Sequence, residues 1–277
     1  MLRRSTMLPY ILRFKPNLRQ VLWGTEDWVV SAHPKGSSVI ANGEFAGKTL
    51  RDVWPDFPLL FKVIDAHTCL SVQVHPNEQT CLVTGGEPKT EMWCLLNDGV
   101  IYAGLKPGTG ARDVEEAVRS GAIEDVLVRH EAKAGDVFFI PGGLVHTIGD
   151  NTRLYEVQQS SDTTFRLCDW GRVGADGRPR QLHVAESRKA IGYGLPPPQA
   201  AKAASCPFFR FAQEDVTTRR TLEIDADFAV LYVTRGSVVM EDGVLAEGES
   251  ALVTRRGRLT VEGAQAHLLV TLPGKGL

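Results

Sequence analysis

The sequence predicts an all-β fold with one large and one small barrel. Short apolar runs alternate with turn residues over most of the chain, apolar residues at helical spacing are concentrated in one segment, and three consecutive prolines interrupt the chain in its last third. With 277 residues and 43% hydrophobic content, the chain can bury a sizeable core. We therefore expect two β domains joined by a linker at the prolines.

The composition excludes several classes of protein. The 31 basic and 33 acidic residues are mixed throughout, so we expect no nucleic-acid partner. No apolar run approaches the roughly 20 residues that span a bilayer. The five cysteines include no C-x-x-C pair, which argues against a disulfide framework or a thiolate zinc site. Met1 to Pro16 lacks the apolar core of a signal peptide, so a cytoplasmic location is expected.

The first domain, predicted for residues 1–194, is built from short strands. Thr109 to Arg129 breaks the pattern, because its apolar residues recur at helical spacing; we expect one or two helices in 109–129, inserted as a flank to the barrel. Gly171 to Arg180 is polar and rich in glycine, which predicts a loop. The predicted strands are Ser38 to Ala41, Leu59 to Ile64, Leu70 to Val74, Asp136 to Ile140, Thr152 to Gln158 and Thr163 to Cys168.

Residues 195–203 carry the triple proline, which fits neither a helix interior nor a central strand, and are expected to form the linker. A second β domain is predicted for residues 204–277, with strands near Phe228 to Val233 and His267 to Thr271. Its one histidine, His267, lies in an apolar run. We therefore expect the chemistry, and any metal ligands, to belong to the first domain.

The segment Leu70 to Pro76 carries the first candidate site residues. In a strand, Val72 and Val74 point one way while Ser71, Gln73 and His75 point the other. Polar groups that face a barrel lumen need partners or a ligand.

Two further segments supply polar groups. Lys89 and Glu91 also share one strand face, and His146 follows a glycine turn, a strand and a Pro-Gly-Gly corner that begin at Gly135. One amide, two imidazoles and one carboxylate suit Zn²⁺, Mn²⁺, Co²⁺ or Fe²⁺. Such an ion can stabilise the charge that an aldose–ketose isomerisation develops on oxygen.

These segments resemble a known family. Gly135 to His146 is similar to the second cupin motif. Ser71 to Pro76, Lys89 to Glu91 and Gln159 to Arg166 together resemble the compact bacterial form of the type I phosphomannose isomerases, and the likeness runs from about residue 12 to about residue 198. The resemblance implies a cupin jelly-roll barrel. It also implies interconversion of mannose 6-phosphate and fructose 6-phosphate through a cis-enediol, with one divalent metal ion per chain, Zn²⁺ being the first expectation.

The resemblance also implies roles for individual residues. Arg166 matches an active-site arginine, Asp162 the carboxylate four residues before it, and Lys89 an active-site lysine. Ser71 and Lys62 match positions that hold the substrate phosphate. The metal ligands would be Gln73, His75, Glu91 and His146.

Some alternatives stay open at this point. The proton carrier between C1 and C2 is Lys89, Glu156 or a water molecule on the metal; we rank Lys89 first and expect Glu156 to line the substrate site. Asp162 and Arg166 could instead form a structural ion pair. The sequence does not distinguish a monomer from a homodimer.

The function itself also has rivals. Trp23 to Trp28 is shorter than the corresponding loop of the family, which leaves room for a different or unphosphorylated sugar, or for a sugar-phosphate-binding cupin without catalysis. A redox cupin is less favoured, because such sites more often have a histidine where this chain has Gln73.

Overall fold

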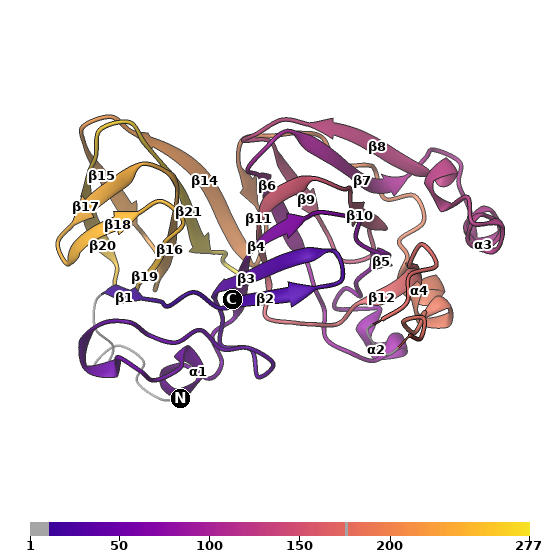
Figure 1. Cartoon of the computed structure of the whole chain (residues 1–277), viewed down its shortest axis with the longest axis horizontal. Coiled ribbons are helices and arrows are strands. Elements are labelled where there is room, and N and C mark those ends of the chain that lie inside the picture. Colours follow the sequence, from indigo (N-terminus) through magenta and orange to yellow (C-terminus); the bar gives the residue numbers. More distant parts are fainter. Residues whose placement is uncertain (1–10, 175–176) are drawn as a thin grey trace. The chain divides into compact units, whose positions relative to one another are not determined.

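The computed structural model describes residues 11–174 and 177–277. Residues 1–10 lie outside this part, and with them most of the N-terminal segment for which no export signal is predicted. Residues 175 and 176, within the loop predicted at 171–180, also lie outside it. Strands predominate, which confirms the all-β prediction (Figure 1). In the described part of the chain, no helix is long and apolar enough to cross a membrane.

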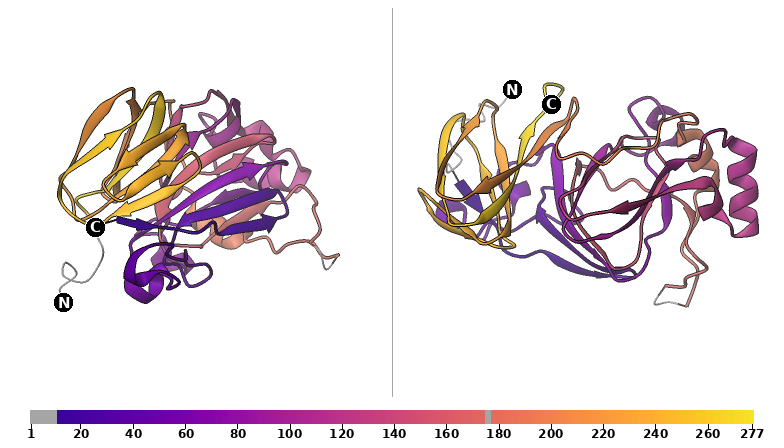
Figure 2. Two further views of the ribbon diagram at one scale, coloured as in Figure 1. Left: turned by 60° about the vertical axis from the view of Figure 1, so that its left-hand side comes forward. Right: turned by 90° about the horizontal axis from the view of Figure 1, so that it is seen from above.

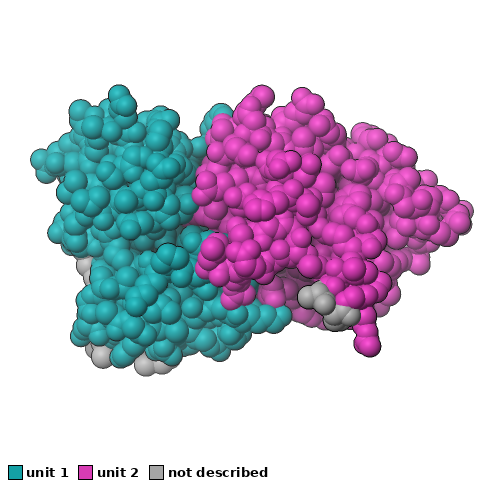
Figure 3. All heavy atoms as spheres, viewed as in Figure 1, with its two compact units in different colours: residues 1–17, 27–61, 202–277 teal, residues 18–26, 62–201 magenta. Residues whose placement is uncertain are grey.

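The chain divides into two compact units (Figure 3). Unit 2 comprises residues 18–26 and 62–201, and unit 1 comprises the residues up to 17 together with 27–61 and 202–277. This division differs from a single cut at the predicted linker, 195–203, because residues 27–61 are grouped with the C-terminal segment. Antiparallel pairing of β1 (Ile11–Arg13) with β19 (Ser250–Val253) joins distant segments within unit 1.

Unit 2 is the jelly-roll barrel, built from two sheets (Figures 1 and 2). Strands β3 and β4 contribute to it only their residues up to 26 and from 62 on. The first sheet has the order β2 (Leu18–Val21), β3 (Gly24–Val30), β4 (Leu59–Ala66), β11 (Thr152–Gln159), β6 (Glu91–Leu95), β9 (Val137–Ile140). The second has the order β12 (Phe165–Cys168), β5 (Val72–Val74), β10 (His146–Ile148), β7 (Gly99–Leu105), β8 (Leu127–Ala132).

Apolar side chains fill both sides of the second sheet. Between the sheets, Trp93, Phe138 and Leu154 of the first meet Ile101 and Ile148 of the second. On the outer side, a second cluster joins strands β5 and β12 to helices. The helices of the unit are α2 (Cys81–Thr84), α3 (Ala111–Ser120), the 3-10 turn Ile123–Val126, and α4 (Val184–Ala190).

The predicted helical insertion lies on this outer side, as a flank to the barrel. Val114 and Ala117 of α3 are buried in the outer cluster, and Gly121 ends the helix with a positive φ of 75°. The helical prediction extends too far, however, because Leu127 begins β8 and pairs with Leu105 of β7. Burial in the sheet outweighs the helical spacing of the residues before it.

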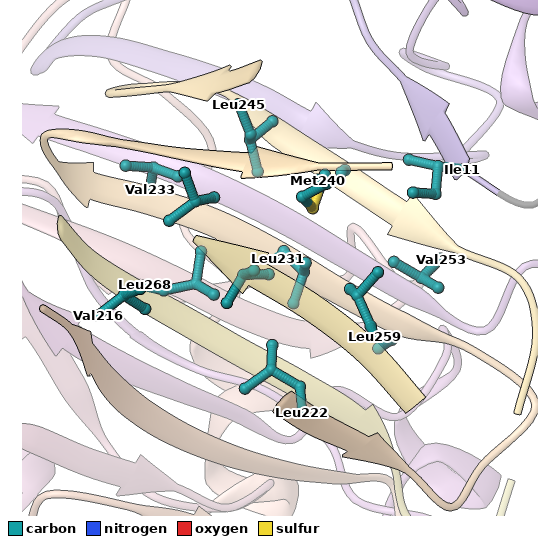
Figure 4. Close-up of a cluster of buried hydrophobic side chains, with 14 of the residues drawn as sticks. Ile11, Val216, Leu222, Leu231, Val233, Met240, Leu245, Val253, Leu259 and Leu268 are labelled. Atoms are coloured by element: carbon teal, nitrogen blue, oxygen red, sulfur yellow. The ribbon is translucent and has the colours of Figure 1, made fainter. Parts of the chain in front are cut away.

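Unit 1 contains the smaller barrel, around a separate apolar cluster (Figure 4). Leu231, Leu259 and Leu268 are among its fully buried residues. One sheet has the order β1, β19, β16 (Ala229–Arg235), β21 (Ala266–Pro273), β14 (Phe209–Val216), β13 (Ala204–Ser205). The other has the order β15 (Arg219–Ile224), β20 (Gly257–Glu262), β17 (Ser237–Met240), β18 (Gly243–Ala246).

The segment 27–61 of unit 1 holds the 3-10 turn Gly43–Phe45 and α1 (Leu50–Val53), whose first turn is capped by Thr49. The helical stretch expected after Gly47 is therefore present. The strand expected at 38–41 is reduced to isolated bridge pairs at Val39 and Ile40.

Candidate metal centre

The four predicted metal ligands lie on, or directly after, three strands of unit 2. Gln73 is in the middle of β5, and His75 is the residue directly after that strand. His146 begins β10, where it is the antiparallel register partner of Gln73, and Glu91 begins β6 in the facing sheet. The alternation predicted for β5 is present, since Val72 and Val74 are buried in the outer cluster.

The Pro-Gly-Gly corner brings His146 close to the end of β5. Gly143 N donates to His75 O at 2.7 Å, and Gly142 N donates to Thr90 Oγ1 at 3.1 Å. A Cβ atom at Gly142 would lie 2.8 Å from Pro76 O, so this close approach requires glycine. The glycines of the motif thus determine where the histidine that follows them lies.

The ligand atoms converge on one point. His75 Nε2 and His146 Nε2 each lie 3.5 Å from an oxygen of Glu91, and Gln73 Nε2 lies 3.3 Å from His146 Nε2. The ligand atoms of the two histidines and Glu91 all lie within 4.8 Å of one another, and the three residues are buried. Rotation of the Gln73 amide by 180° would direct its oxygen, rather than its nitrogen, to the same point.

Main-chain carbonyls fix the orientation of both imidazoles. His75 Nδ1 lies 2.8 Å from Thr163 O, and His146 Nδ1 lies 2.8 Å from Leu144 O. Because a carbonyl only accepts, each Nδ1 carries the proton and donates. Each Nε2 therefore presents its lone pair to the centre of the cluster, as a metal-binding histidine does.

Burial shifts the protonation of these groups. It lowers the pKa of His75 well below the ordinary value and that of His146 to about 4, so both imidazoles are neutral near pH 7. Burial, together with the nearby Glu156 carboxylate, raises the pKa of Glu91 to about 7. A buried carboxylate with a raised pKa is stabilised by a cation beside it.

The surroundings of Glu91 test whether a metal ion fits. Among the described residues, neither Glu91 oxygen accepts a well-directed hydrogen bond, although both are fully buried. Lys89 Nζ lies 3.0 Å from Glu91 Oε2 and 3.1 Å from His75 Nε2, so an ammonium group already occupies a position beside two of the ligand atoms. Two neutral imidazoles, an amide and a buried carboxylate fit a divalent cation.

Lys62 and Glu156, which were expected to face the substrate, are paired with each other. Lys62 Nζ donates to Glu156 Oε1 at 2.9 Å, and Trp93 Nε1 donates to Glu156 Oε2 at 3.0 Å. Both charged residues are buried. The Trp93 ring packs edge-on against His146, with 5.3 Å between ring centroids. This pair is therefore linked to the candidate metal centre through Trp93.

Arg166 lies on β12 as a register partner of Gln73. Its Nε donates to Ser71 Oγ at 3.3 Å, and its Nη1 donates to Gln181 O at 2.9 Å. Asp162 lies in the loop between β11 and β12. The Arg166 guanidinium bonds to Ser71 and to the Gln181 carbonyl, and the alternative of a structural ion pair between Asp162 and Arg166 stays a prediction.

A charged cluster beside Arg166 was not predicted. The buried carboxylate of Asp169 pairs with Arg172 at 2.6 Å and also pairs with Arg180. Burial, followed by the charge of Arg180, lowers the pKa of Arg166 below its ordinary value. The sequence predicts a polar loop at 171–180, and the one signal that could have revealed the cluster is the presence of three arginines, Arg172, Arg178 and Arg180, soon after Arg166.

Comparisons with known proteins show to which family the chain is similar. The family model that describes the catalytic domain of type I phosphomannose isomerases matches residues 5–90. The mannose-6-phosphate isomerase ManA of Bacillus subtilis is 35% identical over 213 residues, which are 65% of this chain and 67% of ManA. The mannose-6-phosphate isomerase of Streptococcus mutans is 30% identical over 260 residues, which are 82% of each protein.

The fold is similar to a solved structure as well. The crystal structure of the mannose 6-phosphate isomerase from Bacillus subtilis superimposes with a TM-score of 0.85 at 25% sequence identity. The match covers 95% of this chain and 99% of the other. The jelly-roll prediction is thereby confirmed.

Proposed function

Because this chain belongs to the type I phosphomannose isomerase family, we propose that it interconverts mannose 6-phosphate and fructose 6-phosphate through a cis-enediol intermediate. The enzyme class, an isomerase, follows from the family. The observation that carries the proposed chemistry is the convergence of two neutral imidazoles and an amide on the buried carboxylate of Glu91.

Gln73, His75, Glu91 and His146 would hold one divalent ion, for which Zn²⁺ is the first choice. When bound, such an ion supplies Lewis-acid stabilisation of negative charge on substrate oxygen. The chain provides the rest of the site. The carbonyls of Thr163 and Leu144 fix the ligand rings, and burial keeps both histidines neutral and able to bind.

Lys89 is the best-supported proton carrier. In the forward direction Lys89 would first have to lose a proton from its ammonium group; the neutral amine would then take the proton from C2 of the aldose and return it to C1, while the hydroxyl proton moves from O2 to O1. Its Nζ lies beside the ligand atoms, 3.1 Å from His75 Nε2. Glu156 is a poorer candidate, because its two oxygens already accept hydrogen bonds from Lys62 and Trp93.

Ser71 and Arg166 would contact the substrate on the other side of the metal centre. Ser71 lies two residues before Gln73 on the same strand face, about 7 Å along the strand. This spacing suits a sugar whose C1 and C2 lie at the metal and whose phosphate lies near the Ser71 hydroxyl. The guanidinium of Arg166 can stabilise an enediolate. Lys62 is less suited to hold phosphate, because it is buried against Glu156.

The test is metal-restored turnover. The purified protein is stripped of metal, Zn²⁺, Mn²⁺ or Co²⁺ is added back separately, and formation of fructose 6-phosphate from mannose 6-phosphate is followed. We expect activity with at least one ion, loss of metal binding and activity in Glu91→Gln, and normal activity in the matched control Glu131→Gln, whose carboxylate is exposed.

Two outcomes would contradict parts of the proposal. Full activity after metal removal, or in Glu91→Gln, would refute the metal site. Metal binding without turnover of mannose 6-phosphate would refute the substrate, and the same assay with unphosphorylated mannose would then test the principal rival.

A further inference from the structure

The turn between β2 and β3 consists of Leu22 and Trp23, and the Trp23 ring is its aromatic surface. The Trp23 carbonyl accepts hydrogen bonds from His67 N at 2.8 Å and from Thr68 N at 3.1 Å. At the next residue, Gly24, a Cβ atom would lie 2.1 Å from Asp65 O. The Trp23 side chain also packs against the apolar core between the sheets. The turn is therefore anchored on the end of β4.

Arg180 lies over this surface. Its guanidinium carbon is 5.0 Å from the centroid of the Trp23 ring, a cation–π contact. On another side its Nε donates to Asp169 Oδ2 at 2.7 Å, and its Nη2 also bonds to Asp169. An aromatic face and a carboxylate together fix a planar guanidinium in position and direction.

The cluster carries more positive charge than its own carboxylate balances. Arg172 Nη2 donates to Asp169 Oδ1, the oxygen that Arg180 Nη2 also contacts. Arg172 Nη1 donates to the carbonyl oxygen of Cys69 at 2.5 Å, and Cys69 lies two residues before Ser71. Arg166 bonds to Ser71, and the positive charges of Arg180 and Arg172 act on its guanidinium to lower its pKa. Among these four charged residues, three guanidinium groups share one carboxylate in a partly buried place. A phosphate monoester carries about −1.5 to −2 at pH 7 and complements them.

We propose that Arg180 binds the phosphate of the substrate and that Trp23 is a positioning residue that holds Arg180 for this task. The proposal rests on the proposed function for the identity of the sugar, but its phosphate-binding claim can be tested without turnover. Trp23 would act through Arg180, by keeping the guanidinium flat against the indole and directed by Asp169. The pair would thereby favour a phosphorylated over an unphosphorylated sugar.

The first test measures KM and kcat for mannose 6-phosphate on the metal-loaded enzyme. Arg180→Ala should raise KM about tenfold or more, as expected for loss of a charge-assisted hydrogen bond, with kcat nearly unchanged. Trp23→Leu should raise KM by about threefold to tenfold, and Trp23→Phe should restore most of the loss because a ring face remains. Arg129→Ala is the matched control, since Arg129 is an exposed arginine that pairs with Glu131.

The second test is independent of activity. Inorganic phosphate is titrated into the metal-stripped protein, and binding is followed by calorimetry. The wild type and Arg129→Ala should bind phosphate, and Arg180→Ala and Trp23→Leu should bind it more weakly. If the wild type binds phosphate in this way but does not turn over mannose 6-phosphate, the proposed function fails while the phosphate site stands.

Several results would overturn the proposal. Unchanged KM and phosphate affinity in Arg180→Ala would remove Arg180 from the site, and a fall in kcat without a change in KM would indicate a merely structural role. If Trp23→Phe is as impaired as Trp23→Leu, the ring face is not what holds Arg180. The double variant should be no worse than Arg180→Ala alone; additive effects would show that Trp23 does not act through Arg180.

Discussion

Gln73 and His146 are direct register partners on the antiparallel strands β5 and β10, and their side chains meet at 3.3 Å between the two Nε2 atoms. Paired residues on adjacent strands have Cβ atoms about 5 Å apart, which is close enough for both side chains to reach one ion. Half of the candidate ligand set is thus fixed by strand register. Ligands that sit on a sheet are more precisely held than ligands on loops.

Replacing Gln73 should weaken the metal site without unfolding the barrel. Gln73→Ala removes one of the four proposed ligands, and we expect metal affinity to fall at least tenfold, the lower end of what loss of even an outer partner costs. The measurement is competition with a chelator of known affinity. Gln79→Ala, at an exposed glutamine in the loop that follows β5, should bind metal as the wild type does. Equal affinity in the two variants would remove Gln73 from the ligand set.

The buried pair of Lys62 and Glu156 should matter to stability. Lys62→Met would leave the Glu156 carboxylate buried beside Trp93 without its cation, and we expect the free energy of unfolding to fall by about 3–5 kcal/mol. Urea unfolding measures the effect. Lys62→Met combined with Glu156→Leu should recover much of the loss, because no unpaired charge remains. A double variant as unstable as the single one would contradict this account.

Gly24→Ala should destabilise unit 2 through a steric clash. The added Cβ would lie 2.1 Å from Asp65 O, so the backbone must shift, and we expect a cost above about 1 kcal/mol in urea unfolding. Gly47→Ala is the control, since Gly47 also has a positive φ, of 89°, but open space around its Cβ position. If the two variants lose equal stability, conformational strain alone explains the effect and the clash does not.

The Asp169 cluster should make stability depend on pH in the acid range. Burial by itself would raise the pKa of the Asp169 carboxyl, but hydrogen bonds from Arg180 and Arg172 lower it below its ordinary value. A lowered folded-state pKa gives stability that is present above the unfolded-state value, about 3.9, and is lost as pH falls through the folded-state value. The wild type should therefore exceed Asp169→Asn in unfolding free energy at pH 7, and the difference should shrink below about pH 4. A difference that is constant between pH 7 and pH 3 would contradict this linkage.

Local patterns were sufficient to predict the proposed metal ligands. Alternation along β5 placed Gln73 and His75 on one face, and the glycines before His146 marked a tight corner that the structure contains. Both signals depend on residues that are neighbours in the chain. Strand geometry and turn geometry are therefore enough to predict where these side chains point.

Contacts between distant segments were beyond the reach of such patterns. Nothing local in residues 27–61 indicates that they group with residues 202–277, because that grouping depends on long-range packing. Lys62 gave a similar difficulty, since its partner Glu156 lies 94 residues away. Asp169 and Arg180 meet across a loop that has no periodic signal.

The carbonyls of Leu144 and Thr163, which orient the two imidazoles, belong to the main chain. Every residue type carries such an acceptor, so no side-chain replacement at these two positions deletes it. A point mutation at either position therefore changes the orientation of the rings only if it changes the path of the backbone. Replacing Leu144 or Thr163 can consequently move the rings only indirectly, through the core packing of Leu144 or through the hydrogen bond from Glu87 N to Thr163 Oγ1.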